Sequence, residues 1–460
     1  MKHCGKTLAL TLLALSSESY SETVKFEPAL GLETAYVDNL DLEKRGGRSD
    51  FVSQINPEFI LEIASNRIDA NADYRLQNLF YHSNTDLNTS FHQLNADTTI
   101  HIIPTKFRLQ SVASYDQQTI SFDNPTGSNN LTGADNTTDR TVFGVEPVWV
   151  TNVTDRLIAE ISAGHYLTGD QIDSDSTNYA IDIYPFLNKS PLNWRLTVQQ
   201  RYIRYDNDQE RDVGRTVASF DFPLTNLLSA VAEIGYETND TDDGLTTETD
   251  NGFLYSAGFR WFPQGNVTIS LNYEDHWYGD FLSADVAYEK NRFAFTFTYD
   301  QEVTSQQDQD ISNLTAAPGN VTSPVQTNST DTFLQKTLAV TARYTYGRGK
   351  LTLEGRQDDR ETENIRSLVT RPQEELMEVN LDWEHNLTRR HTLTLSFFQR
   401  DREVRDGRSN KDYIATVTLA YQLNSALKGT FYLNSNQRNS DLTSAEYEST
   451  IIGASIHAKF

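Results

Sequence analysis

His82, Ser83 and Asn84 place the side-chain types of a lipid hydrolase next to one another in the sequence. Such an enzyme needs a nucleophile and a base whose functional groups meet in space. Three consecutive residues in one polar loop cannot converge in this way, and His165 is a lone histidine on a predicted strand. Exposure to water explains these residues adequately, so the sequence predicts that the protein is not an enzyme.

An acidic segment that begins at Asn239 has oxygen ligands at alternate positions and a glycine, as a calcium-binding loop does. Asp240, Asp242 and Asp243 are candidate ligands for loosely held Ca²⁺ or Mg²⁺ that bridges to lipopolysaccharide phosphates. The glutamate that such a loop requires at its twelfth place is missing, because Asn251 stands there. Solubility of an external loop explains the same residues, so we predict no metal and no other cofactor.

Charged and apolar residues alternate in several segments, for example from Lys350 to Arg360 and from Leu376 to His385. A charge that faces lipid near the bilayer midplane is costly, so in a membrane strand these residues must face a wet lumen. We expect Arg400 and Arg402 to lie near Asp382 and Glu384, in ladders that suit a hydrated solute such as a sugar polymer, or any passive pore. The predicted lumen-lining residues are Arg195, Arg201, Glu354, Arg356, Asp358, Arg360, Glu378, Asp382, Glu384, Arg400 and Arg402.

The elements that would position these residues recur roughly every 20 residues as amphipathic segments. Short, turn-like connections such as Ser65-Asn66 alternate with mostly longer polar ones such as Asp38–Asp50. This alternation is typical of an outer-membrane barrel with tight periplasmic turns and long external loops, here acidic ones. The fold prediction is all-β: a single-chain transmembrane antiparallel β-barrel of about 22 strands, with about 20 or 24 as alternatives and both termini in the periplasm.

The chain ends on a strand with one apolar face, as bacterial outer-membrane barrels do. Its alternate positions, which we interpret as an insertion signal for the barrel-assembly machinery, are Ile452, Ala454, Ile456, Ala458 and Phe460. Aromatic residues gather at segment ends and are expected to form the two girdles at the membrane interfaces. They include Phe80-Tyr81, Phe259–Pro263 and Trp277-Tyr278.

Composition and charge narrow the class of protein further. Only 37% of residues are hydrophobic, yet 11% are aromatic, which suits neither a disordered chain nor a large soluble enzyme. The formal net charge of −25 excludes a nucleic-acid partner, and outer-membrane lipid and lipopolysaccharide are the expected surroundings.

Residues 1–21 have the pattern of a secretory signal peptide, with Lys2 and Lys6 before the apolar run Leu8–Leu15. Residues 22–460 would then form the barrel. The single Cys4 lies in the signal peptide, so no disulfide is expected in the mature chain. No apolar stretch is long enough for a transmembrane helix, and if the chain spans a membrane it must do so as a barrel.

Several short blocks of sequence are distinctive: Tyr36–Leu40, Gln77–Tyr81, His92–Leu94, Ser114–Ser121, Gly235–Asp240 and Ala257–Pro263. In these blocks the chain resembles the outer-membrane β-barrel family associated with the PEP-CTERM/exosortase system. The resemblance implies the cell outer membrane of a Gram-negative bacterium and a role beside an exopolysaccharide export system. It supplies no catalytic residues, and the segment Thr304–Asp331 does not align with the family pattern.

These observations predict a porin-like conduit or scaffold for export or assembly of an extracellular polysaccharide. The alternative is a non-conducting structural or adhesive barrel that displays acidic loops. Few residues separate the signal peptide from the first strand, which leaves no room for a plug domain and counts against a TonB-driven transporter. If the lumen is closed, a loop must fold into it, and the candidates are Thr304–Asp331 first and Asp123–Thr137 second.

Overall fold

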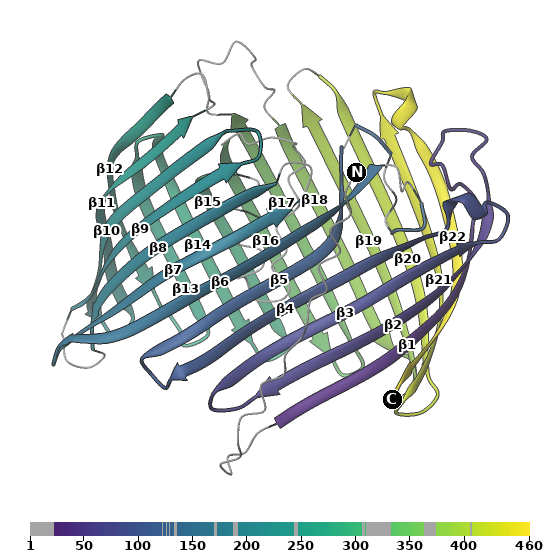
Figure 1. Cartoon of the computed structure of the whole chain (residues 1–460), viewed down its shortest axis with the longest axis horizontal. Helices are drawn as coiled ribbons and strands as arrows, with labels where there is room; N and C mark the ends of the chain where they lie inside the picture. Colours follow the sequence, from purple (N-terminus) through teal and green to yellow (C-terminus); the bar gives the residue numbers. More distant parts are fainter. Residues whose placement is uncertain are drawn as a thin grey trace.

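The computed structural model describes residues 23–121, 123–125, 127, 129–132, 136–169, 173–186, 192–242, 247–305, 309, 333–362, 374–404 and 407–460. These residues form a single antiparallel sheet that closes into a barrel (Figure 1). The predicted signal peptide, 1–21, lies outside the described residues. Within these ranges, no helix has the length and apolar character needed to cross a bilayer.

The described residues contain 22 strands and two short 3-10 helices, which confirms the predicted fold and strand number. The first eleven strands are β1 (Thr23–Val37), β2 (Asp50–Ala64), β3 (Ile68–Tyr81), β4 (Thr89–Ile103), β5 (Phe107–Thr119), β6 (Thr137–Thr154), β7 (Leu157–Gly169), β8 (Ser174–Pro185), β9 (Asn193–Tyr205), β10 (Glu210–Thr225) and β11 (Leu228–Asp242). The others are β12 (Thr247–Trp261), β13 (Val267–His276), β14 (Gly279–Lys290), β15 (Phe293–Thr304), β16 (Phe333–Tyr346), β17 (Gly349–Thr362), β18 (Glu374–Asn386), β19 (His391–Val404), β20 (Ser409–Gln422), β21 (Leu427–Ser440) and β22 (Tyr447–Lys459). The 3-10 helices are η1 (Thr85–Leu87) and η3 (Thr443–Ala445).

Pairing between β1 and β22 closes the barrel, in a register that runs from Ala29 opposite Lys459 to Val37 opposite Ile451. The backbone N–H of Phe460 extends this seam by donating to the carbonyl of Pro28 at 2.9 Å. Closure removes the sheet edges, so the strands satisfy their backbone groups within the wall wherever they are paired on both sides, as a hydrocarbon environment demands. The C-terminus lies at the rim that carries the short turns (Figure 1).

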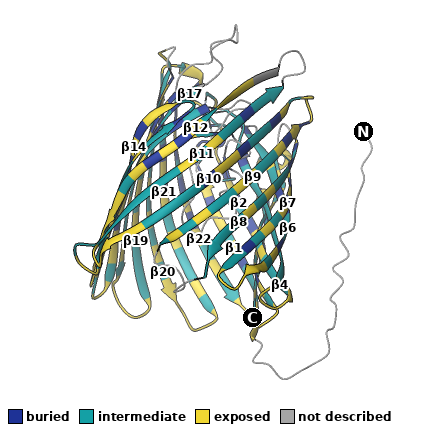
Figure 2. Ribbon diagram, turned by 90° about the vertical axis from the view of Figure 1, so that its left-hand side faces the viewer, coloured by how far each residue is buried: buried dark blue, intermediate teal, exposed yellow. Residues whose placement is uncertain are grey.

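The two faces of the wall follow directly from the alternation of side chains. Along β22, Ile452 and Ile456 are 44% and 53% exposed, whereas Ile451, which directly precedes Ile452, is fully buried. Cross-strand partners share a face, so the same series of exposed apolar residues continues through Leu433 on β21 and Val417 on β20. Exposed and less exposed residues alternate along the strands seen in Figure 2. The exposed apolar face is the one that meets lipid.

The strands run further toward the external rim than the hydropathy pattern predicts. The sequence pattern predicts polar loops at Asp206–Val213 and Asn239–Asp250, but β10 begins at Glu210, β11 ends at Asp242 and β12 begins at Thr247. Beyond the bilayer both faces of a strand are wet, so the ladder of backbone hydrogen bonds continues while the apolar alternation stops. The sequence therefore gives loop bounds that are too wide on this side.

Two tight hairpins depend on residues that tolerate positive φ. Gly279 has φ of 128° where β13 turns into β14, and Asn291 has φ of 54° in the turn between β14 and β15. Glycine adopts this region without steric cost, and asparagine is among the few other residues that do so readily.

In the longer β1–β2 loop, Asp41 accepts hydrogen bonds from the Arg48 side chain, which lower the pKa of the Asp41 carboxyl below its usual value.

A small apolar cluster lies inside the barrel near the external rim. It is formed by Ala35, Val37, Leu40, Val52, Leu79, Tyr81, Leu131 and Ile451. Tyr81 was predicted to belong to an interface girdle, and this prediction is wrong. Its neighbour Phe80 is 44% exposed on the outer face, and adjacent strand residues point to opposite sides, so Tyr81 faces inward at 4% exposure.

Candidate functional site in the barrel lumen

The predicted lumen-lining residues all lie on the inward face of the wall. Registers between β17, β18 and β19 place Arg356 opposite Glu378 and Glu378 opposite Arg400, on the face away from the exposed Leu351, Leu353 and Met377. The same face carries Glu354, Asp358, Arg360, Asp382, Glu384 and Arg402. Arg195 and Arg201 share the inward face of β9, opposite the exposed Val198 and Tyr202.

Arginines and carboxylates pair across adjacent strands, but the expected partners of Arg400 and Arg402 are wrong. Arg400 Nε lies 2.7 Å from Glu378 Oε1, and Arg402 bonds to Glu374. Asp382 instead accepts from the Ser396 hydroxyl at 2.5 Å. The strands are antiparallel, so residues near the C-terminal end of β19 meet the N-terminal part of β18, away from Asp382 and Glu384.

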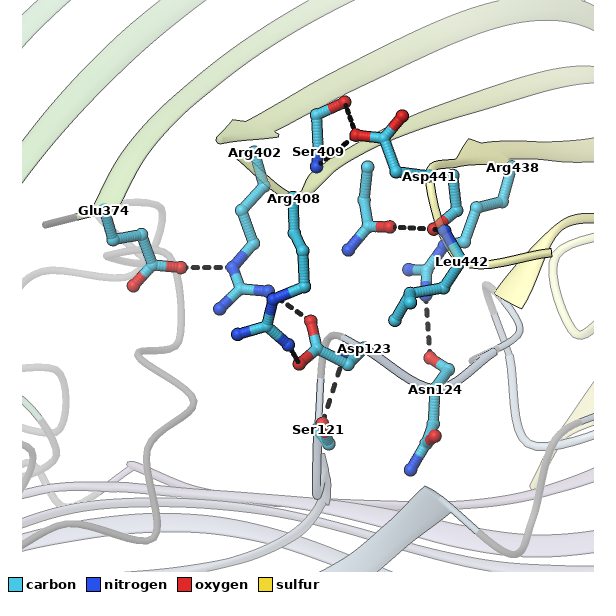
Figure 3. Close-up of polar contacts among 12 residues, drawn as sticks. Ser121, Asp123, Asn124, Glu374, Arg402, Arg408, Ser409, Arg438, Asp441 and Leu442 are labelled. Atoms are coloured by element: carbon cyan, nitrogen blue, oxygen red, sulfur yellow. Dashed lines mark hydrogen bonds and ion pairs between the residues drawn. The ribbon is translucent and has the colours of Figure 1, made fainter. Parts of the chain in front are cut away.

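The segment between β5 and β6 leaves its own side of the barrel and reaches the wall formed by β19, β20 and β21 (Figure 3). Asp123 accepts from Arg402 Nη1 at 3.0 Å and from Arg408 Nη1 at 2.5 Å. The carbonyl of Asn124 accepts from Arg438 Nη1 at 2.7 Å. Seven strands separate β5 from β19 along the shorter way round the barrel, so these contacts are made across the lumen.

The same segment is fixed a second time on the wall formed by β1, β2, β3 and β22. The side-chain amide of Asn130 donates to Gln77 Oε1 at 3.0 Å, and the hydroxyl of Tyr81 donates to the carbonyl of Leu131 at 3.1 Å. Leu131 is only 2% exposed, because it completes the apolar cluster inside the barrel. We call residues 120–136 the lumen segment, since its described part is bound to two different parts of the inner wall.

Asn136 closes the base of the lumen segment. Its side chain accepts from the backbone N–H of Ser121 at 3.0 Å and donates to the carbonyl of Ser121 at 2.7 Å. It is 6% exposed. Buried side-chain amides that satisfy loop backbone in this way hold the loop in one conformation.

The two predicted candidates for a loop in the lumen can now be compared. The described part of Asp123–Thr137 lies there. Most of Thr304–Asp331 lies outside the described residues, but Gln309 is 4% exposed and its amide donates to Gln335 Oε1 at 2.6 Å. Gln335 is on the inward face of β16, so Gln309 also contacts the lumen wall.

A recess of about 470 Å³ opens in the inner wall from β8 to β13. Its lining includes Tyr184, Arg195, Asp221, Glu233, Arg260 and Glu274. The guanidinium of Arg195 lies 5.0 Å from the centre of the Tyr184 ring, and Arg260 Nη1 lies 3.2 Å from Asp221 Oδ2. Carboxylates, guanidiniums and a tyrosine hydroxyl give this surface many donors and acceptors for a hydroxyl-rich ligand.

The residues considered for catalysis or metal binding do not assemble into such a site. His82 Nε2 lies 2.9 Å from the Ser53 hydroxyl, whereas Ser83 and Asn84 donate their backbone N–H groups to Asp50. His165 is on the exposed face of β7, 3.1 Å from the Thr177 hydroxyl. Asp240 and Asp242 occupy outward positions of β11, and Asp243 lies outside the described residues. Among the described residues, no three acidic, histidine or cysteine side chains are grouped to hold a metal ion.

Several residues of the lumen site could not be predicted from the sequence. On β21 the apolar Phe431 and Leu433 stand at odd positions and Arg438 at an even one, so the sequence predicts that Arg438 points inward. The sequence does not predict its contact with Asn124. Asp123, Asn130 and Leu131 lie in a polar loop whose pattern gives no sign of where they bind.

No protein-family model matches the sequence, and no curated protein matches it. Solved structures with a similar fold include the FrpB iron transporter from Neisseria meningitidis (F5-1 variant), with 9% identity and a TM-score of 0.53 over 94% of this chain and 82% of that chain. The siderophore receptor PirA from Acinetobacter baumannii has 8% identity and a TM-score of 0.51, over 95% of this chain and 81% of that chain. At this identity the likeness shows the fold alone. The closed barrel with its exposed apolar belt is an outer-membrane β-barrel of the Gram-negative type, with its outer face in lipid.

Proposed function

We propose that the barrel is a conduit through which a hydrated, hydroxyl-rich polymer or oligomer leaves the cell, without catalysis by the barrel itself. The observation that carries this proposal is the lumen segment, which is bound to two different parts of the inner wall through residues 123–124 and 130–131. A segment held by a few exchangeable polar contacts and one leucine can leave its place without disturbing the strand pairing of the wall. The lumen segment would therefore restrict the passage in its bound position and widen it when released.

The chemistry of the wall supports a polar solute. Charged and amide side chains face inward on β2, β3, β17, β18 and β21, and the recess lined by Tyr184 and Arg195 adds an aromatic ring to them. Such a lining can replace part of the hydration of a sugar that passes along it. Export of an exopolysaccharide, alongside a synthesis and export system, is the role that the resemblance to PEP-CTERM-associated barrels implies, and we propose it on that ground.

Linking the lumen segment covalently to the wall should abolish current through the barrel. The test pair is Gln77→Cys with Asn130→Cys, whose native side chains are 3.0 Å apart, joined by a short bifunctional thiol reagent that dithiothreitol can cleave. The chain has one cysteine, Cys4, in the predicted signal peptide, so the mature protein gives no competing thiol. In planar bilayers, the linked barrel should lose its open states and regain them after reduction.

The matched control joins two residues of the wall and leaves the lumen segment unlinked. Asp116 and Arg140 form an ion pair at 2.8 Å between β5 and β6, so Asp116→Cys with Arg140→Cys accepts the same reagent. This link should leave the current unchanged. Equal currents before and after linking Gln77→Cys to Asn130→Cys would contradict gating by the segment. Zero current from every variant would instead favour a structural or adhesive barrel.

A further inference from the structure

The wall that receives Asp123 carries a cluster of arginines, although the chain as a whole is acidic. Among the described residues, ion pairs join six arginines to four wall carboxylates and to Asp123 of the lumen segment. The arginines are Arg356, Arg360, Arg400, Arg402, Arg408 and Arg438, and the carboxylates are Asp358, Glu374, Glu378 and Asp412. The whole chain has a formal net charge of −25, so a patch this rich in arginine contrasts with the composition of the molecule around it.

Asp123 is the carboxylate that the lumen segment contributes to this patch (Figure 3). It bonds to Arg402 and Arg408 at once, one guanidinium on each oxygen. The side chain of Arg402 is 13% exposed, and those of Asp123 and Arg408 are 30% and 39% exposed, so the site is partly shielded from water. Charge-assisted hydrogen bonds in such surroundings are stronger than those at an open surface.

Arg360 shows that this patch has hydrogen-bonding capacity left. Its side chain is 4% exposed, and its two terminal nitrogens make no hydrogen bond within the described part of the chain. They lie 3.5 Å from Glu374 and 4.0 Å from Asp358, close enough for attraction without a well-directed bond. Glu374 also bonds to Arg402, so Arg360 is connected to the site that Asp123 occupies.

We propose that Arg402, Arg408 and Arg438 form a recognition site for the carboxylate groups of an acidic glycan, and that Asp123 is an internal competitor for it. This inference rests on the proposed conduit function and names the class of its solute. Planar guanidiniums match carboxylates in geometry and charge, and Asp123 shows the pose that a solute carboxylate would take. A glycan with many carboxylates would displace Asp123 by occupying the site repeatedly, and the lumen segment would then be released from this wall.

The proposal predicts that removing the competitor strengthens binding. We expect Asp123→Asn to bind a galacturonic acid tetramer about tenfold more tightly than wild type, because the solute no longer has to displace charge-assisted hydrogen bonds from the two arginines. Adding Arg402→Gln and Arg408→Gln to this variant should remove the binding. Affinities would be measured by isothermal titration calorimetry in detergent, with maltotetraose, a neutral glucose tetramer, as the uncharged probe.

Asp116→Asn is the matched control, because Asp116 pairs with Arg140 in the wall and takes no part in the Asp123 site. Equal affinities in wild type and Asp123→Asn would overturn the proposal, as would tighter binding that survives loss of both arginines. If Asp123→Asn does not fold, the test is Arg408→Gln alone, since Arg408 is the most exposed arginine of the three. This variant must bind the galacturonic acid tetramer more weakly than wild type does. Conductance recorded on the same preparations distinguishes an error in the acidic-glycan site from an error in the conduit function. A barrel that conducts without binding the acidic tetramer contradicts only the acidic-glycan site.

Discussion

Barrels in which residues 120–136 are replaced by a two-residue Asn-Gly turn between β5 and β6 should conduct several times more current than wild type. The lumen segment reaches from its own side of the barrel to β19–β21 and back to β3, so its removal takes material out of the passage. A lumen enclosed by 22 strands is wide unless something fills it. Single-channel recordings in planar bilayers measure the change directly.

A second variant separates the volume of the lumen segment from its attachment. A Gly-Ser segment of equal length keeps the volume and loses Asp123, Asn130, Leu131 and Asn136. We expect this variant to fluctuate between low and high conductance, because no side chain holds the segment on the wall. Wild-type conductance in the turn variant would show that the segment does not limit the passage.

Leu433→Arg should destabilise the barrel in lipid by about 2–4 kcal/mol, the cost of a lipid-facing arginine near the bilayer midplane. Leu433 is 40% exposed in the middle of β21, with Val417 and Ile452 beside it on the outer face. The free energy of unfolding would be measured by reversible urea denaturation in lipid vesicles. The same substitution in a soluble sheet with an exposed face would cost far less.

Thr418→Arg is the matched control for this prediction. Thr418 lies on β20 next to the outward Val417, but it shares the inward face with Tyr432. An arginine there reaches water, so the free energy of unfolding should change little. Equal losses from the two substitutions would mean that the exposed apolar face is not the lipid face.

The fold could be predicted from sequence because lipid outside and water inside impose one rule on every strand. Leu351 and Leu353 alternate with Glu354 and Arg356 for this reason, and the structure keeps them on opposite faces. The rule ends where the bilayer ends. Residues such as Asn239–Asp242 are polar on both sides, so only the backbone pairing with β12 reveals that they extend a strand.

The contacts inside the lumen could not be predicted, because they join residues far apart in the chain. Asp123 and Arg408 are 285 positions apart, and Asn124 and Arg438 are 314 apart. No local pattern encodes such a pair. The inward direction of an arginine is readable from the alternation of its strand, but its partner depends on register and on the path of a loop.

Release of a labelled galacturonic acid tetramer from liposomes tests the central claim most directly, since the claim is that this barrel is a polar conduit narrowed by its own lumen segment. We predict slow release through wild-type protein and fast release through the variant with the Asn-Gly turn, each proportional to the amount of inserted barrel. Retention of the tetramer by both proteins, with circular dichroism confirming folded β-barrels in the membrane, would contradict the account.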